Sequence, residues 1–184
     1  FNYEMLDRKA LLDVLPGLGP DVVGGSWCPH DGHVNPLYLL RSLHNCFLTR
    51  NGQLLHDAEV FDITHEEGVF DVFSRKGQFQ APCLVLAAGL GNRKLAPLIG
   101  LKQPVRPQKG QILVTQKIDK LIDVPMTLLR QTAEGSIMIG DSKEEVGFDI
   151  SSSIDIMAQI ADRARRTLPV LEKQQIIRLS LIHI

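Results

Sequence analysis

Small residues end an apolar run near the middle of the chain, in the stretch "CLVLAAGLG" from Cys83 to Gly91. Where a buried strand ends in Ala and Gly, backbone amides can approach a phosphate or a ribose without intervening side chains. Ligands also collect at the carboxyl ends of strands in open α/β sheets. Gly89 and Gly91 therefore fit one part of a nucleotide site, but a buried strand that only needs a tight turn would show the same residues.

The complete phosphate-binding fingerprints are absent from this sequence. Gly17 and Gly19 begin a G-x-G pattern, but Val22 stands where the third glycine of G-x-G-x-x-G belongs. The pattern G-x-x-x-x-G-K-[ST] does not occur either. The turn at Gly89 and Gly91 alone therefore does not predict a complete dinucleotide site.

A second polar cluster, "CPHDGH", contains Cys28, His30, Asp31 and His33. A zinc site needs more ligands, in pairs, and no other histidine pair supplies them, so we predict no metal site. Asp31 and His33 could act in general acid–base catalysis. The stretch "DGHVNP" is also explained as a turn that leads into a capped helix.

Composition and charge restrict the class of protein. The 184 residues are 44% apolar and 22% charged, with a formal net charge of -1, which is ordinary for a globular protein and argues against a nucleic-acid binder. No apolar run approaches the roughly 18 residues that span a bilayer. The three cysteines are odd in number and widely spaced, so we expect no disulfide framework and a cytoplasmic location.

Three helices are predicted from capping residues and apolar periodicity. Asp7 caps the first, in "DRKALLDVLP", and Asn35-Pro36 begins the second, which runs from Leu37 to about Thr49. A capping box of Ser152 and Asp155 begins the third, which ends at Pro169. Its apolar stripe consists of Ile156, Met157, Ile160, Ala161, Ala164 and Leu168.

The strands follow two patterns. The pieces "LLHDAEVFDI" and "VFDVFSR" alternate, as half-exposed antiparallel strands do. The continuous apolar run Cys83–Ala88 indicates a strand buried on both faces, as in a parallel sheet. The stretches "GQILVTQ" and "MTLLRQTAEGSIMIGDS" predict further antiparallel strands, so we expect a mixed α/β (α+β) chain in two lobes.

Five segments in order give the chain a family resemblance: "GGSWCPHDGHVNPLYLLRSL", "AEVFDI", "APCLVLAAGLGNRKLAPLIG", "PVRPQKGQILVT" and "LRQTAEGSIMIGDSKEEVGFD". Together they resemble the FAD-dependent amine oxidoreductases of the D-amino-acid oxidase, glycine oxidase and sarcosine oxidase family. The resemblance covers about Leu6 to Arg178. It implies an internal fragment, because the family's G-x-G-x-x-G turn would precede Phe1 and its main carboxylate-binding arginine would follow Arg178.

The resemblance also implies roles for individual residues. Val60 matches an adenine-contacting valine that acts through its backbone, and Ala88 and Gly89 match a flanking backbone contact to FAD. Leu90-Gly91-Asn92 departs from the family, where an aromatic residue often follows the glycine. An ordinary strand valine would explain Val60 equally well.

On the substrate side, the implied chemistry is oxidation of the C–N bond of a small amine or amino acid. Arg130 is the candidate partner for a substrate carboxylate, although it could instead pair with Glu134 across the turn. Met126 matches a cavity-lining position, and core packing would explain it too. No residue is predicted to be catalytic.

The resemblance suggests that residues 1–36 and 101–178 form a substrate-binding lobe, and residues 37–100 part of an FAD-binding lobe. Residues 179–184 depart from the family as an atypical tail. We expect FAD in the full-length protein, and expect that the fragment alone is inactive and binds none. We also expect self-association or a partner chain over the incomplete sheet. The alternative is a non-catalytic binding or scaffold module, or a subunit that binds no flavin by itself.

Overall fold

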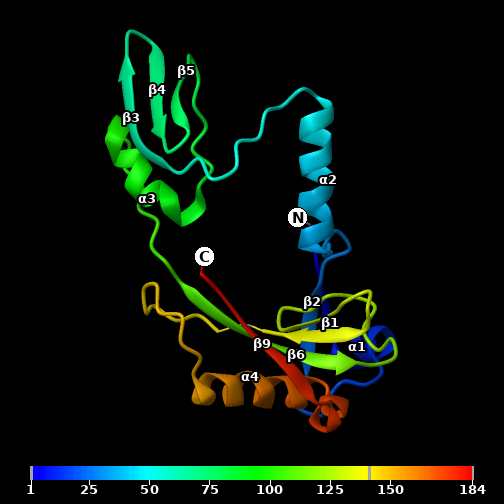
Figure 1. Ribbon diagram of the computed structural model, residues 1–184. Coiled ribbons are helices and arrows are strands. Elements are labelled where there is room, and N and C mark those ends of the chain that lie inside the picture. The colour runs from blue at the N-terminus through cyan, green and yellow to red at the C-terminus, as the bar shows by residue number, and fades with distance from the viewer. Residues whose placement is uncertain (1, 141, 184) are drawn as a thin grey trace. The chain divides into compact units, whose positions relative to one another are not determined.

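The computed structural model describes residues 2–140 and 142–183. By its contacts the chain divides into two compact units. Unit 1 comprises residues 1–35 and 108–183, and unit 2 comprises residues 36–107. Figure 1 shows the elements of each unit, and each unit is described by itself below.

A four-stranded antiparallel sheet organises unit 1, in the order β7-β8-β6-β9. Its strands are β6 (Lys109–Lys117), β7 (Leu129–Gln131), β8 (Ser136–Ile139) and β9 (Ile176–His183). The hairpin of β7 and β8 turns through residues 132–135, which include Glu134 of the turn expected from the sequence. Strand β9 pairs with β6 and includes residues 179–183.

Helix α4 (Ile154–Thr167) covers one face of this sheet and contacts β6 and β8 (Figure 1). Its buried side chains, Ile160 and Ala164, belong to the predicted stripe and pack with Leu113 and Ile137 of the sheet. The short helix η3 (Pro169–Lys173) follows, so Pro169 ends α4 as expected. In β7, β8 and the later part of β6, buried residues alternate with residues that face the opposite side of the sheet, whereas no residue of β9 is buried.

A hairpin and a short helix complete unit 1. Strands β1 (Glu4–Asp7) and β2 (Gly24–Trp27) pair antiparallel, and the segment that connects them in sequence contains α1 (Arg8–Val14). The Asp7 side chain accepts a hydrogen bond from the backbone N–H of Ala10 at 2.8 Å, which confirms the predicted helix cap. Arg8 then donates to the carbonyl oxygens of Gly19 and Val22 and closes the connection to β2.

Unit 2 contains a three-stranded antiparallel sheet in the order β3-β4-β5. The strands are β3 (Val60–Glu66), β4 (Val69–Ser74) and β5 (Gly77–Ala81). Three short helices follow: η1 (Gly89–Gly91), α3 (Asn92–Leu95) and η2 (Ala96–Ile99). Both α3 and η2 contact β3.

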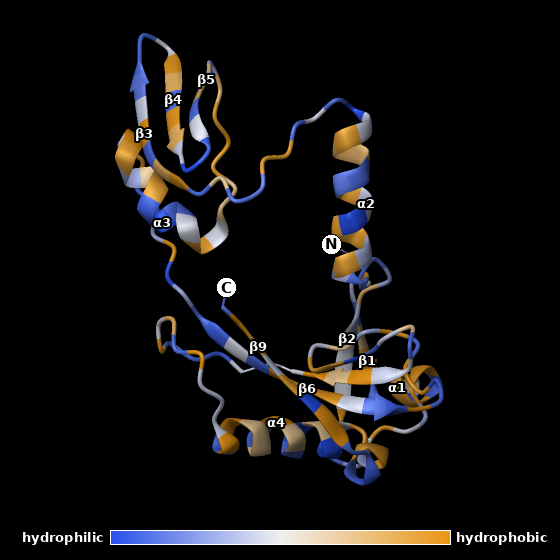
Figure 2. Cartoon of the chain, viewed as in Figure 1, coloured by the Kyte–Doolittle hydropathy of each residue, from blue (hydrophilic) through white to orange (hydrophobic). Residues whose placement is uncertain are grey.

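The helix predicted after Asn35 is also present, as α2 (Pro36–Thr49). None of its residues is buried, although apolar residues recur along its length between polar ones (Figure 2). Its exposed large side chains are Leu37, Tyr38, Leu39, Leu40, Leu43, Phe47 and Leu48. Periodicity therefore located this helix, but the described residues supply no surface that buries its apolar face.

Two local predictions are wrong. Residues 83–88 form no strand in any sheet of the described residues, and Val85 is 80% exposed. Apolar character indicates burial, but a strand exists only where a neighbouring strand pairs with its backbone. Every ladder formed by the described residues is antiparallel, and none of them includes residues 83–88. Ser153, not Ser152, caps α4, because its hydroxyl accepts from the N–H of Ile156.

Candidate functional site

Met126 and Arg130, the two predicted substrate residues, line one surface cavity of about 280 Å³ in unit 1. Leu129 and Gln131 on β7 are buried, and Arg130 between them is half-buried on the other face. Met138 on β8 and Ile112 on β6 line the same cavity. The alternation of the strands therefore places this cavity on the sheet face opposite the core.

Arg130 has an unusual set of partners. It lies directly opposite Met138 in the β7–β8 ladder, and its Nη2 donates to the Met138 Sδ at 2.9 Å. Among the described residues no carboxylate pairs with it, so the suggested ion pair with Glu134 does not form there. The Arg130 guanidinium is held by a weak acceptor and retains further donors for a ligand in the cavity.

Gln131 anchors the strand that carries Arg130. Its buried Oε1 accepts hydrogen bonds from the backbone N–H groups of Leu121 and Ile122, at 2.7 and 3.0 Å. Its Nε2 donates to the carbonyl oxygens of Asp119 and Gly135 at 3.0 Å. Sequence reasoning missed this residue, because an alternating strand pattern does not distinguish a buried glutamine from an exposed one.

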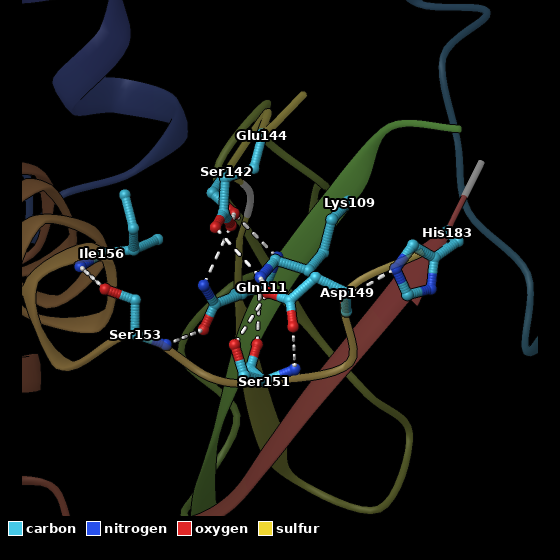
Figure 3. A network of polar contacts seen from close by, with 9 residues as sticks. All are labelled: Lys109, Gln111, Ser142, Glu144, Asp149, Ser151, Ser153, Ile156 and His183. Atoms are coloured by element: carbon cyan, nitrogen blue, oxygen red, sulfur yellow. Dashed lines mark hydrogen bonds and ion pairs between the residues drawn. The ribbon is translucent and has the colours of Figure 1, made fainter. Parts of the chain in front are cut away.

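A buried lysine organises the segment that follows β8 (Figure 3). Lys109 is 2% exposed, and its Nζ lies 2.8 Å from Asp149 Oδ2 and 3.3 Å from Glu144 Oε2. Glu144 Oε1 accepts from Ser142 Oγ at 2.6 Å and from Gln111 Nε2 at 2.9 Å. Two acids of the sequence stretch "KEEVGFD", Glu144 and Asp149, therefore bind the buried cation.

The network shifts three pKa values in the directions expected for ion pairs. The hydrogen bond from Lys109 holds the pKa of Asp149 well below its usual range. The same bond, opposed by burial, raises the pKa of Lys109. Burial would raise the pKa of Glu144, but hydrogen bonds from Ser142, Gln111 and Lys109 outweigh it and lower that pKa. All three groups are therefore charged at neutral pH.

This network also connects the cavity to helix α4. Gln111 Oε1 accepts from the N–H of Ser153, the residue that caps α4. Ile112, the next residue of β6, lines the Arg130 cavity. The polar network thus fixes the strand that forms one wall of the cavity.

The predicted cofactor residues lie in unit 2. Gly89 has a φ of 54°, which favours glycine, and nothing lies within 4 Å of the position that a Cβ would take. The N–H of Ala88 donates to Asn92 Oδ1 at 3.1 Å, and its carbonyl accepts from the N–H of Gly91 at 2.9 Å. The Gly89 N–H has no acceptor among the described residues, so it is an open backbone donor of this turn.

Asn92 shapes the turn and was not recognised as important from the sequence. It is buried, and its Nδ2 donates to the Leu86 carbonyl at 3.0 Å while its Oδ1 holds the Ala88 amide. Val60 begins β3, an edge strand of its sheet, and pairs with Ser74. The helix that starts at Asn92 contacts β3, so Val60 and the turn belong to neighbouring elements of one unit.

The "CPHDGH" cluster separates in the structure. Asp31 lines one cavity of unit 1 and His33 lines another. Over residues 2–140 and 142–183, no group of three or more His, Cys, Asp or Glu side chains could hold a metal ion. In the same residues, no helix is long and apolar enough to cross a bilayer.

Comparison with known proteins decides the family. The profile described as FAD dependent oxidoreductase (DAO) matches residues 1–180. The chain belongs to this FAD-dependent oxidoreductase family. An opine oxidase component of Agrobacterium tumefaciens (strain Ach5) is 41% identical over 177 residues, which cover 96% of this chain and 48% of that protein.

Other family members agree in sequence and in fold. Glycine oxidase of Pseudomonas putida is 26% identical over 178 residues, covering 94% of this chain and 49% of that protein. The crystal structure of glycine oxidase from Geobacillus kaustophilus superposes with a TM-score of 0.88 at 21% identity, over 99% of this chain and 50% of that one. The chain therefore spans about half the length of the curated relatives it matches, and the resemblance read from the sequence is confirmed at the level of family and fold.

Proposed function

We propose that this chain is part of an FAD-dependent oxidoreductase that oxidises the C–N bond of a small amine or amino acid. The observation that carries the proposal is the half-buried Arg130, which has no carboxylate partner among the described residues and lines a cavity. Its forked guanidinium is suited to the carboxylate of an amino acid. Relatives that are named for opine oxidase and glycine oxidase support a substrate of this class.

On the cofactor side, the residues of this chain fit a flanking backbone contact to FAD, but they do not form a complete dinucleotide site. Gly89 offers an open N–H on a backbone without a side chain, and Val60 stands on an edge strand that contacts the helix after this turn. When bound, FAD would accept a hydride from the carbon beside the amine, which leaves an imine that water hydrolyses. The chain's own residues would orient the substrate through Arg130 and shape one side of its cavity through Met126.

We further propose that unit 2 is completed by a segment or chain outside these residues. The apolar face of α2 is uncovered, and residues 83–88 are apolar without pairing in any sheet of the described residues. Exposed apolar surface of this extent is typical of an interface. Self-association, a partner chain, or the remainder of a longer protein would each cover it.

Flavin absorbance tests the proposal. We expect little or no bound flavin in the purified 184-residue chain. We expect a flavin spectrum, bleached anaerobically by amine substrates, in a protein extended at both ends to the length of its relatives. An extended, folded protein without flavin would contradict the oxidoreductase proposal and favour the alternative of a non-catalytic binding or scaffold module.

A matched pair of glycine variants tests the cofactor residues in that extended protein. Gly89→Val and Gly68→Val place a branched side chain at positive φ, 54° and 81° respectively, in open space of the same unit. Each should cost stability by roughly 1–3 kcal/mol. Only Gly89→Val should also weaken FAD affinity, by about ten-fold or more, since only that backbone is proposed to contact the cofactor. Equal FAD affinities in the two variants would remove Gly89 from the site.

A further inference from the structure

We propose that the cavity of unit 1 that contains Trp27 and Asp31 is a binding site for a small ammonium ion with an apolar body. Its volume of about 580 Å³ lies within the range of small-molecule sites. All the residues that line it belong to unit 1. The proposal goes beyond the proposed function, because neither Arg130 nor the turn at Gly89 forms part of this cavity.

The walls of the cavity indicate a ligand with an apolar body. Leu11 and Val14 of α1 line it, together with Leu15, which belongs to the buried core cluster of unit 1. Leu18 and Met126 also line it, and both pack against that cluster. The cavity is therefore an open margin of the core, where an apolar group and the protein surface would both leave water on binding.

Hydrogen bonds around the cavity hold its walls in place. Arg8 donates to the carbonyl oxygens of Gly19 and Val22, and Val22 is a lining residue. The N–H of Gly19 donates to the carbonyl oxygen of Thr167 at 2.9 Å, and Thr167 at the end of α4 lines the cavity as well. Because these bonds are present without a ligand, binding should require little further ordering of the chain.

Asp31 determines the charge of the cavity. It is the one charged residue among the described residues of the lining. The turn after β2 places it there, because the N–H of Asp31 donates to the carbonyl oxygen of Cys28 at 3.2 Å. Over residues 2–140 and 142–183, no side chain pairs with its carboxylate. A carboxylate beside apolar walls is suited to an ammonium group, which can donate charge-assisted hydrogen bonds to it.

Trp27 adds a second reason to expect a cation. It is half-buried at the end of β2 and lines the same cavity, and the face of an indole ring attracts an ammonium group. The neighbouring cavity, which shares Met126 and Thr127 with this one, carries the positive charge of Arg130 instead. An ammonium ligand should therefore prefer the cavity of Asp31, and a carboxylate should not.

Tryptophan fluorescence of the whole 184-residue chain tests the site without a cofactor, because Trp27 is the single tryptophan of the sequence. Three probes share one apolar ring and differ in charge: cyclohexylmethylammonium, cyclohexylmethanol and cyclohexanecarboxylate. The ammonium probe should change the fluorescence of Trp27 saturably. The alcohol should bind at least about ten-fold more weakly, and the carboxylate more weakly than the alcohol.

Variants of Asp31 separate the charge from the apolar walls. Asp31→Asn should lower the affinity for the ammonium probe about ten-fold, to the level of the alcohol, and should leave the affinity for the alcohol unchanged. Asp31→Glu keeps the carboxylate and should retain most of the preference. The matched control is Asp13→Asn, which removes an exposed carboxylate of α1 outside the lining and should change neither affinity.

Each outcome bears on the proposal. Unchanged binding of the alcohol by Asp31→Asn would show that the cavity is intact in that variant. Equal affinities for the ammonium probe and the alcohol in the parent chain would overturn the proposal, as would a preference that persists in Asp31→Asn. A loss of preference in Asp13→Asn equal to that in Asp31→Asn would assign the effect to overall charge and would also overturn the site. A fluorescence change that does not saturate would do the same.

Discussion

The two units differ in how completely they bury their apolar side chains. In unit 1, ten residues from α4, the sheet and the adjoining loops form one buried cluster. In unit 2, the buried apolar side chains among the described residues are Ile63 and Ala96, while α2 has no buried residue. Both units carry regular helices and antiparallel strands, so secondary structure alone does not distinguish them.

This contrast shows that unit 1 contains its own stabilising core and that unit 2 leaves apolar surface uncovered. The hydrophobic effect stabilises a fold in proportion to the apolar area removed from water. Unit 1 gains from the packing of α4 on its sheet, and from a buried lysine that is paired with two acids. The predictions below test this contrast, from the largest expected effect to the smallest.

The largest difference in the free energy of unfolding is expected between alanine variants of two leucines, one in each unit. Leu168→Ala removes a side chain that is 0% exposed in unit 1, and should lower the free energy of unfolding by about 2–5 kcal/mol. Leu43→Ala, on the exposed face of α2, should change it by less than about 0.5 kcal/mol in this chain. Urea unfolding followed by circular dichroism measures both.

The same two variants, made in a protein extended to the length of its relatives, test whether α2 is covered there. If α2 is covered there, Leu43→Ala should cost nearly as much as Leu168→Ala. A small effect of Leu43→Ala in both proteins would show that α2 remains exposed and would contradict the proposed covering partner.

Two glutamines provide the next test. Gln131→Ala leaves the N–H groups of Leu121 and Ile122 without their acceptor inside unit 1, and should destabilise it by roughly 1–3 kcal/mol. Gln80→Ala removes an exposed hydrogen bond to Asp71 in unit 2 and should have an effect within about 0.5 kcal/mol. Thermal unfolding of the two variants beside the parent chain checks the difference. Similar losses would mean that Gln131 is not the anchor of β7.

The smallest effect concerns acid pH. The pKa values of Asp149 and Glu144 are lowered in the folded chain. Their contribution to the free energy of unfolding is therefore fully present above the pKa values that these groups have in the unfolded chain, near 4. It is lost as pH falls from there through the folded values, because protonation then favours the unfolded chain. The raised pKa of Lys109 depends on the same two carboxylates, and at the alkaline end its stabilising contribution is lost as pH rises through its folded value.

Urea unfolding between about pH 5 and pH 2 should therefore show a falling stability that Lys109→Met flattens. Asp123→Asn is the control, because Asp123 pairs with Lys120 at the exposed surface. An equal flattening in both variants would show that the buried network does not cause the acid sensitivity.

Much of the local structure could be predicted from the sequence. Asp7 as a cap, the helix that starts at Pro36, and the turn between β7 and β8 depend on residues close together in the chain. The stripe on α4 was predicted correctly as well, because helical periodicity marks the face that packs on a core. The family resemblance was recognisable from ordered motifs.

The strand expected at residues 83–88 shows where such reasoning ends. Apolar composition favours burial, but a neighbouring strand is needed to form the ladder, and none of the described residues supplies one. The roles of Val60, Ala88, Gly89, Arg130 and Met126 remain predictions. The structure adds that the Ala88 N–H donates within the turn, whereas the Gly89 N–H has no acceptor among the described residues.

The sequence by itself determined the local elements and the family, because caps, turns and periodicity act over a few residues. Only the tertiary structure decided that Arg130 lies beside Met138 in a cavity, that Gln131 anchors its strand, and that Lys109 is buried between two acids. These arrangements join residues up to 40 positions apart, as Lys109 and Asp149 are. The Lys109 pairs form only when the sheet and the segment that follows β8 have packed together, so no pattern within a single segment encodes them.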